Sequence, residues 1–89
     1  MPDSLPSIEF ARALLALKQR TGRGYRDLAS SIYVSTAALH RYCAGKALPP
    51  EFGFVKRLAR LAGMRASELE SVRRLWLMAQ LESRPARQQ

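Results

Sequence analysis

Disulfide bonds and membrane spans are the first features that the sequence lacks. Its 89 residues include one cysteine, Cys43, so no internal disulfide can form, and a small secreted domain stabilised by disulfides is excluded. The longest apolar run near the N-terminus, residues 13–17, is too short to span a membrane and follows no basic segment. We therefore expect a cytoplasmic protein without a membrane partner.

Signatures of catalysis and of metal binding are missing as well. The sequence contains no evident carboxylate pair, glycine-rich phosphate loop or nucleophile with a partner base. His40 and Cys43 lie three residues apart, but two ligands do not complete a metal site, and the chain has no other histidine or cysteine. We therefore predict no enzyme activity, no metal and no cofactor, and we interpret Cys43 as a small packing residue.

Residues that favour β-strands are scarce, whereas alanine and leucine dominate the composition. A length of 89 residues allows one domain with one modest core. Apolar residues recur at helical spacing, as Phe10, Leu14 and Leu17 do at positions i, i+4 and i+7. The pattern predicts an all-α fold of five helices, near residues 7–20, 25–32, 36–44, 51–62 and 67–82.

Capping residues indicate where several of these helices begin and end. Ser7 and Ser35 are typical N-caps, and Gly45 is a typical stop for the helix that Ser35 begins. Ser67 and Glu70 have the spacing of a capping box, which predicts that the last helix begins at Ser67. We divide the chain into an irregular lead-in at 1–6, one domain at 7–82 and a flexible tail at 83–89.

The charge balance is strongly basic. Fifteen lysines and arginines stand against seven aspartates and glutamates, which gives a net charge of +8. Basic side chains bind phosphate groups and release counterions, so this charge favours a polyanionic partner such as nucleic acid. A charge that serves solubility, or the arginine-rich coding of a GC-rich genome, is the alternative, because 12 of the 15 basic residues are arginine.

The helix predicted over residues 36–44 has two different faces. Leu39 and Tyr42 point to one side of it at helical periodicity. The opposite side carries small and polar residues, namely Thr36, Ala37, His40, Arg41 and Ala44. A slim face with a few polar groups can enter the major groove of DNA.

The side chains of this slim face match the chemistry of base edges. Arg41 can donate two hydrogen bonds to O6 and N7 of guanine, and His40 can reach guanine or a phosphate. Ala37 and the methyl group of Thr36 can contact a thymine methyl. We therefore expect base contacts from Thr36, Ala37, His40 and Arg41, with an ordinary solvated surface as the alternative for each.

A set of landmarks runs from Tyr25 to Pro49 and continues near the end of the chain. They are Leu28-Ala29, Val34-Ser35, Leu39, Gly45-Lys46, Pro49 and Arg73-Arg74-Leu75-Trp76. These residues resemble the helix-turn-helix of the lambda-repressor-like, Xre-type family, in the form common in actinobacterial regulators. The resemblance implies a compact five-helix bundle that regulates transcription by sequence-specific binding of double-stranded DNA at the nucleoid. We expect it to act as a two-fold dimer.

Three positions depart from the pattern of this family. Gly24 stands where serine or threonine usually caps the second helix, and glycine is the weaker cap. Tyr25 stands where glutamine usually contacts phosphate, and its hydroxyl could do the same. Tyr33 stands in the turn where glycine or asparagine usually adopts a left-handed conformation, which costs tyrosine roughly 1 kcal/mol. We expect either a slightly different turn or a compensating contact of Tyr33.

Further basic and polar residues flank the predicted groove helix. We expect phosphate contacts from Arg23, Tyr25, Arg26, Ser35 and Lys46. A basic stripe on the fourth helix is either a solvated face or another contact with the DNA backbone, and it consists of Lys56, Arg57 and Arg60. Glu51 precedes this stripe and would repel phosphate.

The last predicted helix is apolar on two sides. One stripe faces the core and consists of Leu69, Val72, Trp76 and Ala79. Leu77, Met78 and Leu81 point away from it, and we expect them to contact a second copy or another protein. The alternative function is therefore a protein-interaction module, either antitoxin-like or the N-terminal domain of a larger regulator. Nonspecific nucleic-acid binding through the +8 charge is a third possibility.

Overall fold

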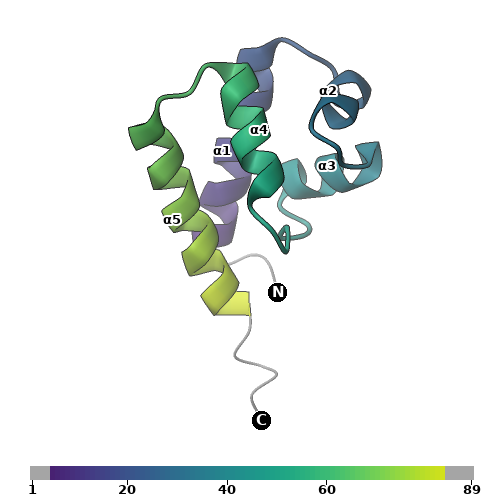
Figure 1. Ribbon diagram of the computed structural model, residues 1–89. Helices are drawn as coiled ribbons and strands as arrows, with labels where there is room; N and C mark the ends of the chain where they lie inside the picture. The colour runs from purple at the N-terminus through teal and green to yellow at the C-terminus, as the bar shows by residue number, and fades with distance from the viewer. Residues whose placement is uncertain (1–4, 84–89) are drawn as a thin grey trace.

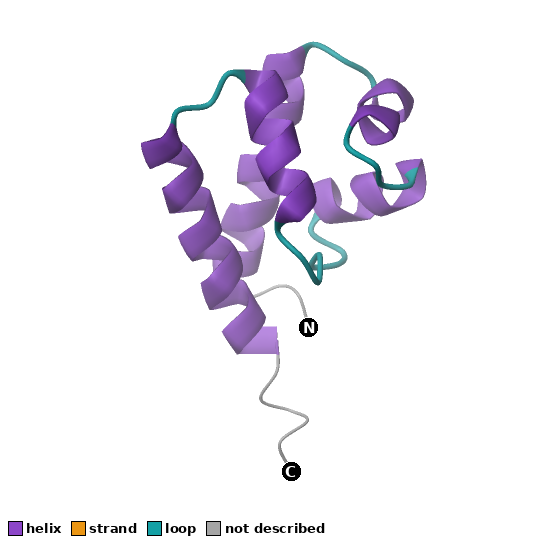
Figure 2. Ribbon diagram, viewed as in Figure 1, coloured by secondary structure: helices purple, strands orange, loops and turns teal. Residues whose placement is uncertain are grey.

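Five α-helices joined by short loops make up the computed structural model of the protein, which describes residues 5–83 (Figures 1 and 2). The helices are α1 (Leu5–Thr21), α2 (Tyr25–Ser31), α3 (Thr36–Ala44), α4 (Gly53–Ala62) and α5 (Ala66–Ser83). No strand occurs among the described residues. The predicted all-α fold of five helices is confirmed, and a tight turn joins α2 to α3.

α1 is the central helix of the bundle. α3, α4 and α5 each pack against it, and α2 packs on α3. Phe10, Leu14 and Leu17 are buried on α1 at helical spacing, so one apolar stripe reaches the middle of the core. Figure 1 shows α5 antiparallel to α1 at one side of the molecule, with α2 and α3 at the opposite side.

Every helix contributes to the hydrophobic core. The core side chains include one from each helix in turn, namely Leu14, Leu28, Leu39, Leu58 and Val72. The four leucines are completely shielded from solvent. Because closely packed side chains leave little room for movement, a core shared by all five helices fixes the position of α3 relative to α1 and α2.

α1 begins at Leu5, two residues before the predicted N-cap Ser7. Ser7 lies inside the first turn of the helix and is buried, so the prediction that it caps α1 is wrong. Pro6 fits the first turn because the backbone N–H groups there have no helical acceptor. The predicted lead-in at 1–6 is therefore shorter than expected, and residues 1–4 lie outside the described part of the chain.

α5 begins one residue earlier than predicted, and its capping contact is a different one. Oε1 of Glu68 accepts a hydrogen bond of 3.0 Å from the backbone N–H of Arg65. The same oxygen lies 3.8 Å from Nη1 of Arg20, so this carboxylate also ties α5 to α1. The capping box predicted from Ser67 and Glu70 is wrong, because α5 begins at Ala66 and the same three-residue spacing is used by Arg65 and Glu68 instead.

Two further helix ends differ slightly from the prediction. α4 begins at Gly53 instead of residue 51, and Phe52 is its N-cap residue. α5 includes Ser83, the first residue of the predicted tail, whereas residues 84–89 lie outside the described part. None of the helices within residues 5–83 is both long and apolar enough to cross a membrane.

Candidate nucleic-acid interface

α3 is capped at both ends by the residues that the sequence indicated. The Ser35 hydroxyl accepts a hydrogen bond of 3.0 Å from the backbone N–H of Ala38. Gly45 ends the helix with a φ of 77°, a left-handed conformation that glycine adopts without strain. A Cβ at Gly45 would also lie 3.4 Å from Cβ of Ala11 on α1. Both predicted caps are confirmed, and they define the length of α3.

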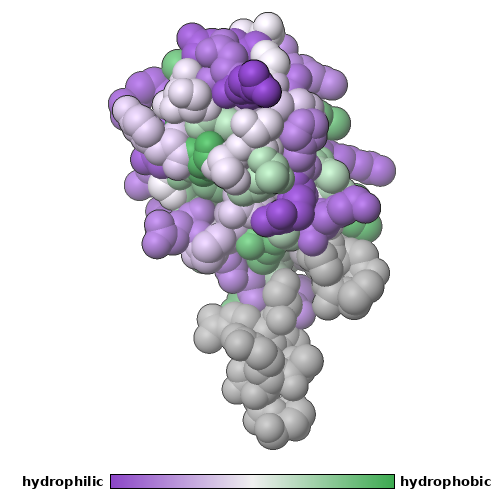
Figure 3. Space-filling model, turned by 90° about the vertical axis from the view of Figure 1, so that its right-hand side faces the viewer, coloured by the Kyte–Doolittle hydropathy of each residue, from purple (hydrophilic) through white to green (hydrophobic). Residues whose placement is uncertain are grey.

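The two faces of α3 separate as helical periodicity predicted. Leu39 and Cys43 are buried, and the Tyr42 ring stacks on Phe54 of α4 with ring centroids 5.3 Å apart. The outer face consists of the half-buried Thr36 and the exposed Ala37, His40, Arg41 and Ala44. Figure 3 views the side of the molecule where α2 and α3 lie, and hydrophilic surface surrounds a paler centre there.

The exposed His40 contacts α2 through its ring. Its ring stacks on Tyr25, the first residue of α2, with ring centroids 3.6 Å apart and an angle of 27° between the planes. Nζ of Lys18 on α1 lies 4.5 Å from the centroid of the same Tyr25 ring. Side chains from three helices therefore meet at the Tyr25 ring, and the stacking orients the imidazole of His40.

Tyr25 was expected to contact phosphate, and its stacking with His40 was not foreseen. No local pattern signals this contact, because the two residues lie on different helices and meet only after the helices pack. Burial raises the pKa of Tyr25, and Cys43 adds to the effect, so the hydroxyl stays protonated at neutral pH. Tyr25 is thus both a ring that orients His40 and a hydrogen-bond donor.

The basic residues near α2 and α3 differ in their exposure and in the contacts that their side chains make. Nη1 of Arg23 donates a hydrogen bond of 2.9 Å to Oγ of Ser31, and its Nε lies 3.9 Å from a carboxylate oxygen of Asp27. Arg23 is therefore aligned along α2. Arg26 and Lys46 are exposed, so they are better placed than Arg23 to extend toward a polyanion.

The turn between α2 and α3 contains the unusual tyrosine that the sequence revealed. Tyr33 has a φ of 64°, the left-handed conformation that glycine usually supplies, and it is 79% exposed. Nε of Arg57 on α4 donates a hydrogen bond of 3.1 Å to the Ile32 carbonyl, and the guanidinium carbon lies 5.0 Å from the centroid of the Tyr33 ring. The turn therefore keeps its left-handed geometry and gains a compensating contact.

Arg57 lies beside Arg60 at the edge of the basic stripe that was predicted on α4. It lies three residues after the buried Phe54, on the side of α4 that faces the turn. Lys56 and Arg60 lie four residues apart and are exposed. Arg57 differs from these two residues because its guanidinium pairs with a carbonyl at the end of α2 that has no helical donor.

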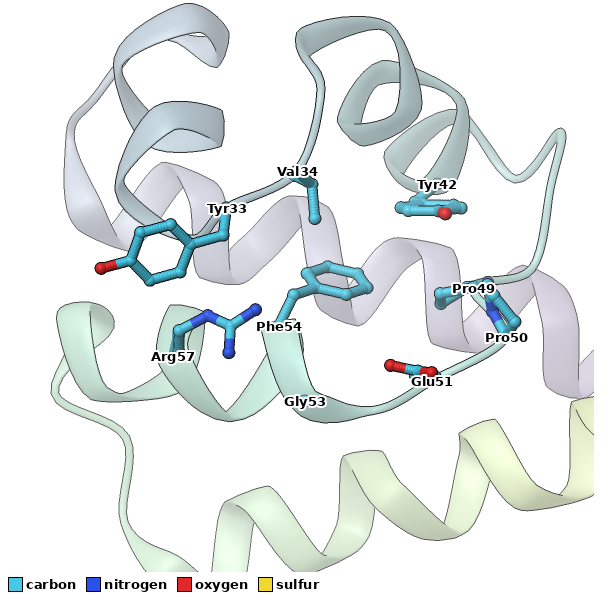
Figure 4. A pocket seen from close by; sticks show the side chains of 9 residues that line it. All are labelled: Tyr33, Val34, Tyr42, Pro49, Pro50, Glu51, Gly53, Phe54 and Arg57. Atoms are coloured by element: carbon cyan, nitrogen blue, oxygen red, sulfur yellow. The ribbon is translucent and has the colours of Figure 1, made fainter.

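An open groove of about 220 Å³ lies between this turn and the beginning of α4 (Figure 4). Tyr33 and Arg57 lie at one end of the groove, and Pro49, Pro50 and Glu51 lie at the other. Glu51 is exposed, so its carboxylate makes this approach to α4 unfavourable for a phosphate.

α5 is joined to the loop after α3 by two side chains. Nε1 of Trp76 and Nε2 of Gln80 both donate hydrogen bonds to the Pro49 carbonyl, over 2.8 and 2.9 Å. The Trp76 ring also packs on Phe52, with ring centroids 5.4 Å apart. Trp76 was interpreted simply as a core residue, but it is half-buried and anchors the chain where it turns from α3 toward α4.

The last turns of α5 expose apolar side chains, as the sequence predicted. Leu77 and Met78 are 46% exposed and Leu81 is 67% exposed. Because α1 is antiparallel to α5, the beginning of α1 lies toward the same end of the molecule (Figure 1). The exposed apolar residues of these two segments, called the apolar end below, are Leu5, Ile8, Leu77, Met78 and Leu81.

Cys43 is expected to resist thiol reagents in the native protein. Burial raises the pKa of its thiol from 9.0 to about 11, although the nearby Lys18 lowers it. Only the thiolate reacts, and this change in pKa leaves about a hundredfold less of it at neutral pH. Alkylation followed by mass spectrometry should be slower by at least that factor in native than in denatured protein. Equal rates would contradict the burial of Cys43.

No metal-binding cluster is present within the part of the chain that the structure describes. There, no three histidine, cysteine, aspartate or glutamate side chains are grouped so that they could bind a metal ion. The buried polar atoms of the side chains in this part all have hydrogen-bond partners.

A comparison with known families gives a match over most of the chain. The model of a family described as a helix-turn-helix domain matches residues 9–72. The matched segment begins within α1, contains α2, the turn, α3 and α4, and ends within α5. Comparisons with curated proteins and with solved structures give no match.

Proposed function

The chain belongs to a helix-turn-helix domain family, and on that premise we propose that it regulates transcription by binding double-stranded DNA sequence-specifically. A helix-turn-helix domain indicates DNA binding in general. Within this group, the resemblance of its landmarks favours the lambda-repressor-like, Xre-type regulators of actinobacterial form. The proposed DNA-binding domain comprises the five helices, close to the predicted limits of 7–82.

The observation that carries this proposal is the outer face of α3, which is slim and carries few charges. Arg41 is exposed there, and its guanidinium can donate two hydrogen bonds to one guanine. Thr36 and Ala37, at the beginning of the helix, offer small apolar groups to a thymine methyl. His40 follows one turn later, oriented by Tyr25, and can donate to or accept from a base edge.

Phosphate contacts on both sides of α3 complete the proposed interface. Arg26 and Lys46 are exposed near α3 and supply positive charge. Tyr25 and Ser35 supply hydroxyl groups, and Ser35 can donate its proton while its oxygen caps α3. Arg23 would have to leave its partners on α2, so we assign it the smallest contribution.

Selection of bound sequences from a random duplex pool tests this proposal directly. We expect one enriched motif, with two half-sites about one helical turn apart if two copies bind together. Affinity for the enriched duplex should exceed that for an unrelated duplex of equal length, and this excess should persist as salt rises. Binding without any enriched motif would contradict the proposal and support nonspecific attraction through the +8 charge.

The apolar end favours a second candidate, a protein-interaction module whose partner is another copy of this chain. A group of large apolar side chains at one end of a small domain is typical of a contact surface. A two-fold dimer would present two copies of α3 to one duplex, so this candidate is compatible with DNA binding. An antitoxin-like protein or the N-terminal domain of a larger regulator would use the same surface for a different partner.

Replacing Leu77 with glutamate is expected to convert a dimer into a monomer. In a dimer through the apolar end, the new carboxylate would lose its hydration without gaining a partner. Sedimentation velocity measures the result. The control is Leu61→Glu, which introduces the same charge at an exposed leucine of α4 outside the apolar end and should leave the dimer intact. A wild-type protein that stays monomeric at high concentration would contradict the dimer.

A further inference from the structure

Arg57 connects α4 to the turn that leads into α3. Its Nε donates a hydrogen bond of 3.1 Å to the carbonyl of Ile32, the C-cap residue of α2. Its guanidinium carbon lies 5.0 Å from the centroid of the Tyr33 ring, at the position where φ is 64°. We call the contacts of Arg57 with Ile32 and Tyr33 the turn latch, and Figure 4 shows the side chains of Arg57 and Tyr33 beside each other.

Two properties of the turn make a cation favourable at this place. The carbonyl groups at the end of a helix lack helical donors and carry partial negative charge, so the Arg57 guanidinium supplies both a donor and a positive charge to the Ile32 carbonyl. The Tyr33 ring offers its π-face to the same guanidinium. The latch therefore stabilises a left-handed backbone that tyrosine by itself disfavours.

The latch joins the turn to a different helix, whereas the other hydrogen bonds of the turn are local. The backbone N–H of Val34 donates to the carbonyl of Ala29, and that of Tyr33 donates to the carbonyl of Ser30. Both acceptors belong to α2. On the α4 side, Tyr33 and Val34 of the turn line an open groove together with Phe54 and Arg57 of α4 (Figure 4). Arg57 therefore adds a polar contact with α4 to the apolar packing of Ile32 and Leu39, which are both buried in the core.

We propose that Arg57 is a positioning residue for DNA recognition, which fixes the turn so that α3 enters the groove at one angle. This inference rests on the proposed function. Thr36 and Ala37 follow the turn directly, so a change in its geometry would displace these two base contacts first. Nε of Arg57 donates to the Ile32 carbonyl. The exposed Lys56 and Arg60 are therefore better placed than Arg57 to contact phosphate from α4. Arg57 thus contributes to discrimination between sequences more than to general affinity for DNA.

Comparing Arg57→Ala with Arg60→Ala separates positioning from charge. Both substitutions remove one positive charge from α4, but only the first breaks the latch. For the duplex that wild-type protein selects, we expect Arg57→Ala to weaken binding about tenfold, the scale of one charge-assisted hydrogen bond. Binding of an unrelated duplex should weaken by no more than about twofold in this variant. Arg60→Ala should change both affinities by the same factor.

The result that would overturn the proposal is an equal loss on both duplexes for Arg57→Ala. Arg57→Lys keeps the positive charge but replaces the planar guanidinium by a single ammonium group. We expect this milder variant to fold and to lose part of the discrimination between the two duplexes. If both Arg57→Lys and Arg57→Ala discriminated between the two duplexes as well as the wild-type protein does, a positioning role would be excluded.

Amide hydrogen exchange gives a readout that does not depend on DNA. We expect the Val34 amide to exchange faster in Arg57→Ala, with no change at the Leu14 amide in the middle of α1, because the latch acts on the turn alone. Unchanged exchange at Val34 would refute the latch while leaving DNA binding intact. A wild-type protein that binds no duplex would refute the proposed function and the positioning role together, even if Val34 exchanged faster in the variant.

Discussion

Replacing Leu14 with alanine is expected to lower the free energy of unfolding by about 2–5 kcal/mol. Leu14 is 0% exposed and lies on α1, against which three other helices pack. Truncation removes buried methyl groups and leaves a cavity that a core shared by five helices cannot close without moving one of them. Since small domains are stable by only about 5–15 kcal/mol, this substitution removes a large fraction of the total.

Urea unfolding followed by circular dichroism measures this loss. The control is Leu61→Ala, which truncates the same side chain at a 40% exposed position of α4 outside the apolar end and should change the free energy of unfolding by less than about 1 kcal/mol. The thermal midpoint of Leu14→Ala should fall by about 4–8 °C for each kcal/mol lost. Similar effects of the two substitutions would mean that α1 is not the centre of the core.

Replacing Arg41 with alanine is expected to weaken binding of the selected duplex by about 1–3 kcal/mol, and binding of an unrelated duplex by much less. The guanidinium lies on the exposed side of α3, where it can donate two hydrogen bonds to one guanine. An unrelated duplex lacks a guanine at the corresponding position. Arg41 of the wild-type protein therefore contributes only the general attraction of its positive charge to DNA. Fluorescence anisotropy with both duplexes at one salt concentration measures the two losses.

Lys46→Ala is the matched control for Arg41→Ala, because it also removes one exposed positive charge close to α3. A phosphate contact carries no sequence information, so this variant should lose affinity for both duplexes alike. It should also reduce the slope of log affinity against log salt by about one. If Arg41→Ala behaved in the same way as Lys46→Ala, Arg41 would be a phosphate contact and the proposed base contact would be wrong.

The ends of α3 could be predicted from the sequence because capping is local chemistry. Ser35 lies three residues before the N–H group that it accepts from, and Gly45 needs only its own freedom to adopt a positive φ. The same reasoning was wrong at Ser7 and at Ser67. α1 continues back to Leu5, and α5 takes its capping carboxylate from a residue that also pairs with α1.

Tyr33 departs from the family pattern in the turn, and this departure alone allowed a prediction about the turn. Its position predicted either a changed turn or a compensating contact, and the structure has the left-handed turn together with Arg57 beside it. Arg57 itself was grouped with Lys56 and Arg60, since charge and helical spacing alone do not show which arginine faces a neighbouring helix end. The strain was thus visible in the sequence, and the residue that relieves it was not.

The sequence by itself determined five helices, the buried stripe of α1 and the slim outer face of α3, because these depend on periodicity and on capping over a few residues. Only the tertiary structure decided which side chains meet across helices. Tyr25 stacks on His40, Arg57 binds the turn, and Trp76 donates to the loop after α3. Each of these contacts joins separate elements, so it depends on how the helices pack, which no local pattern of residues encodes.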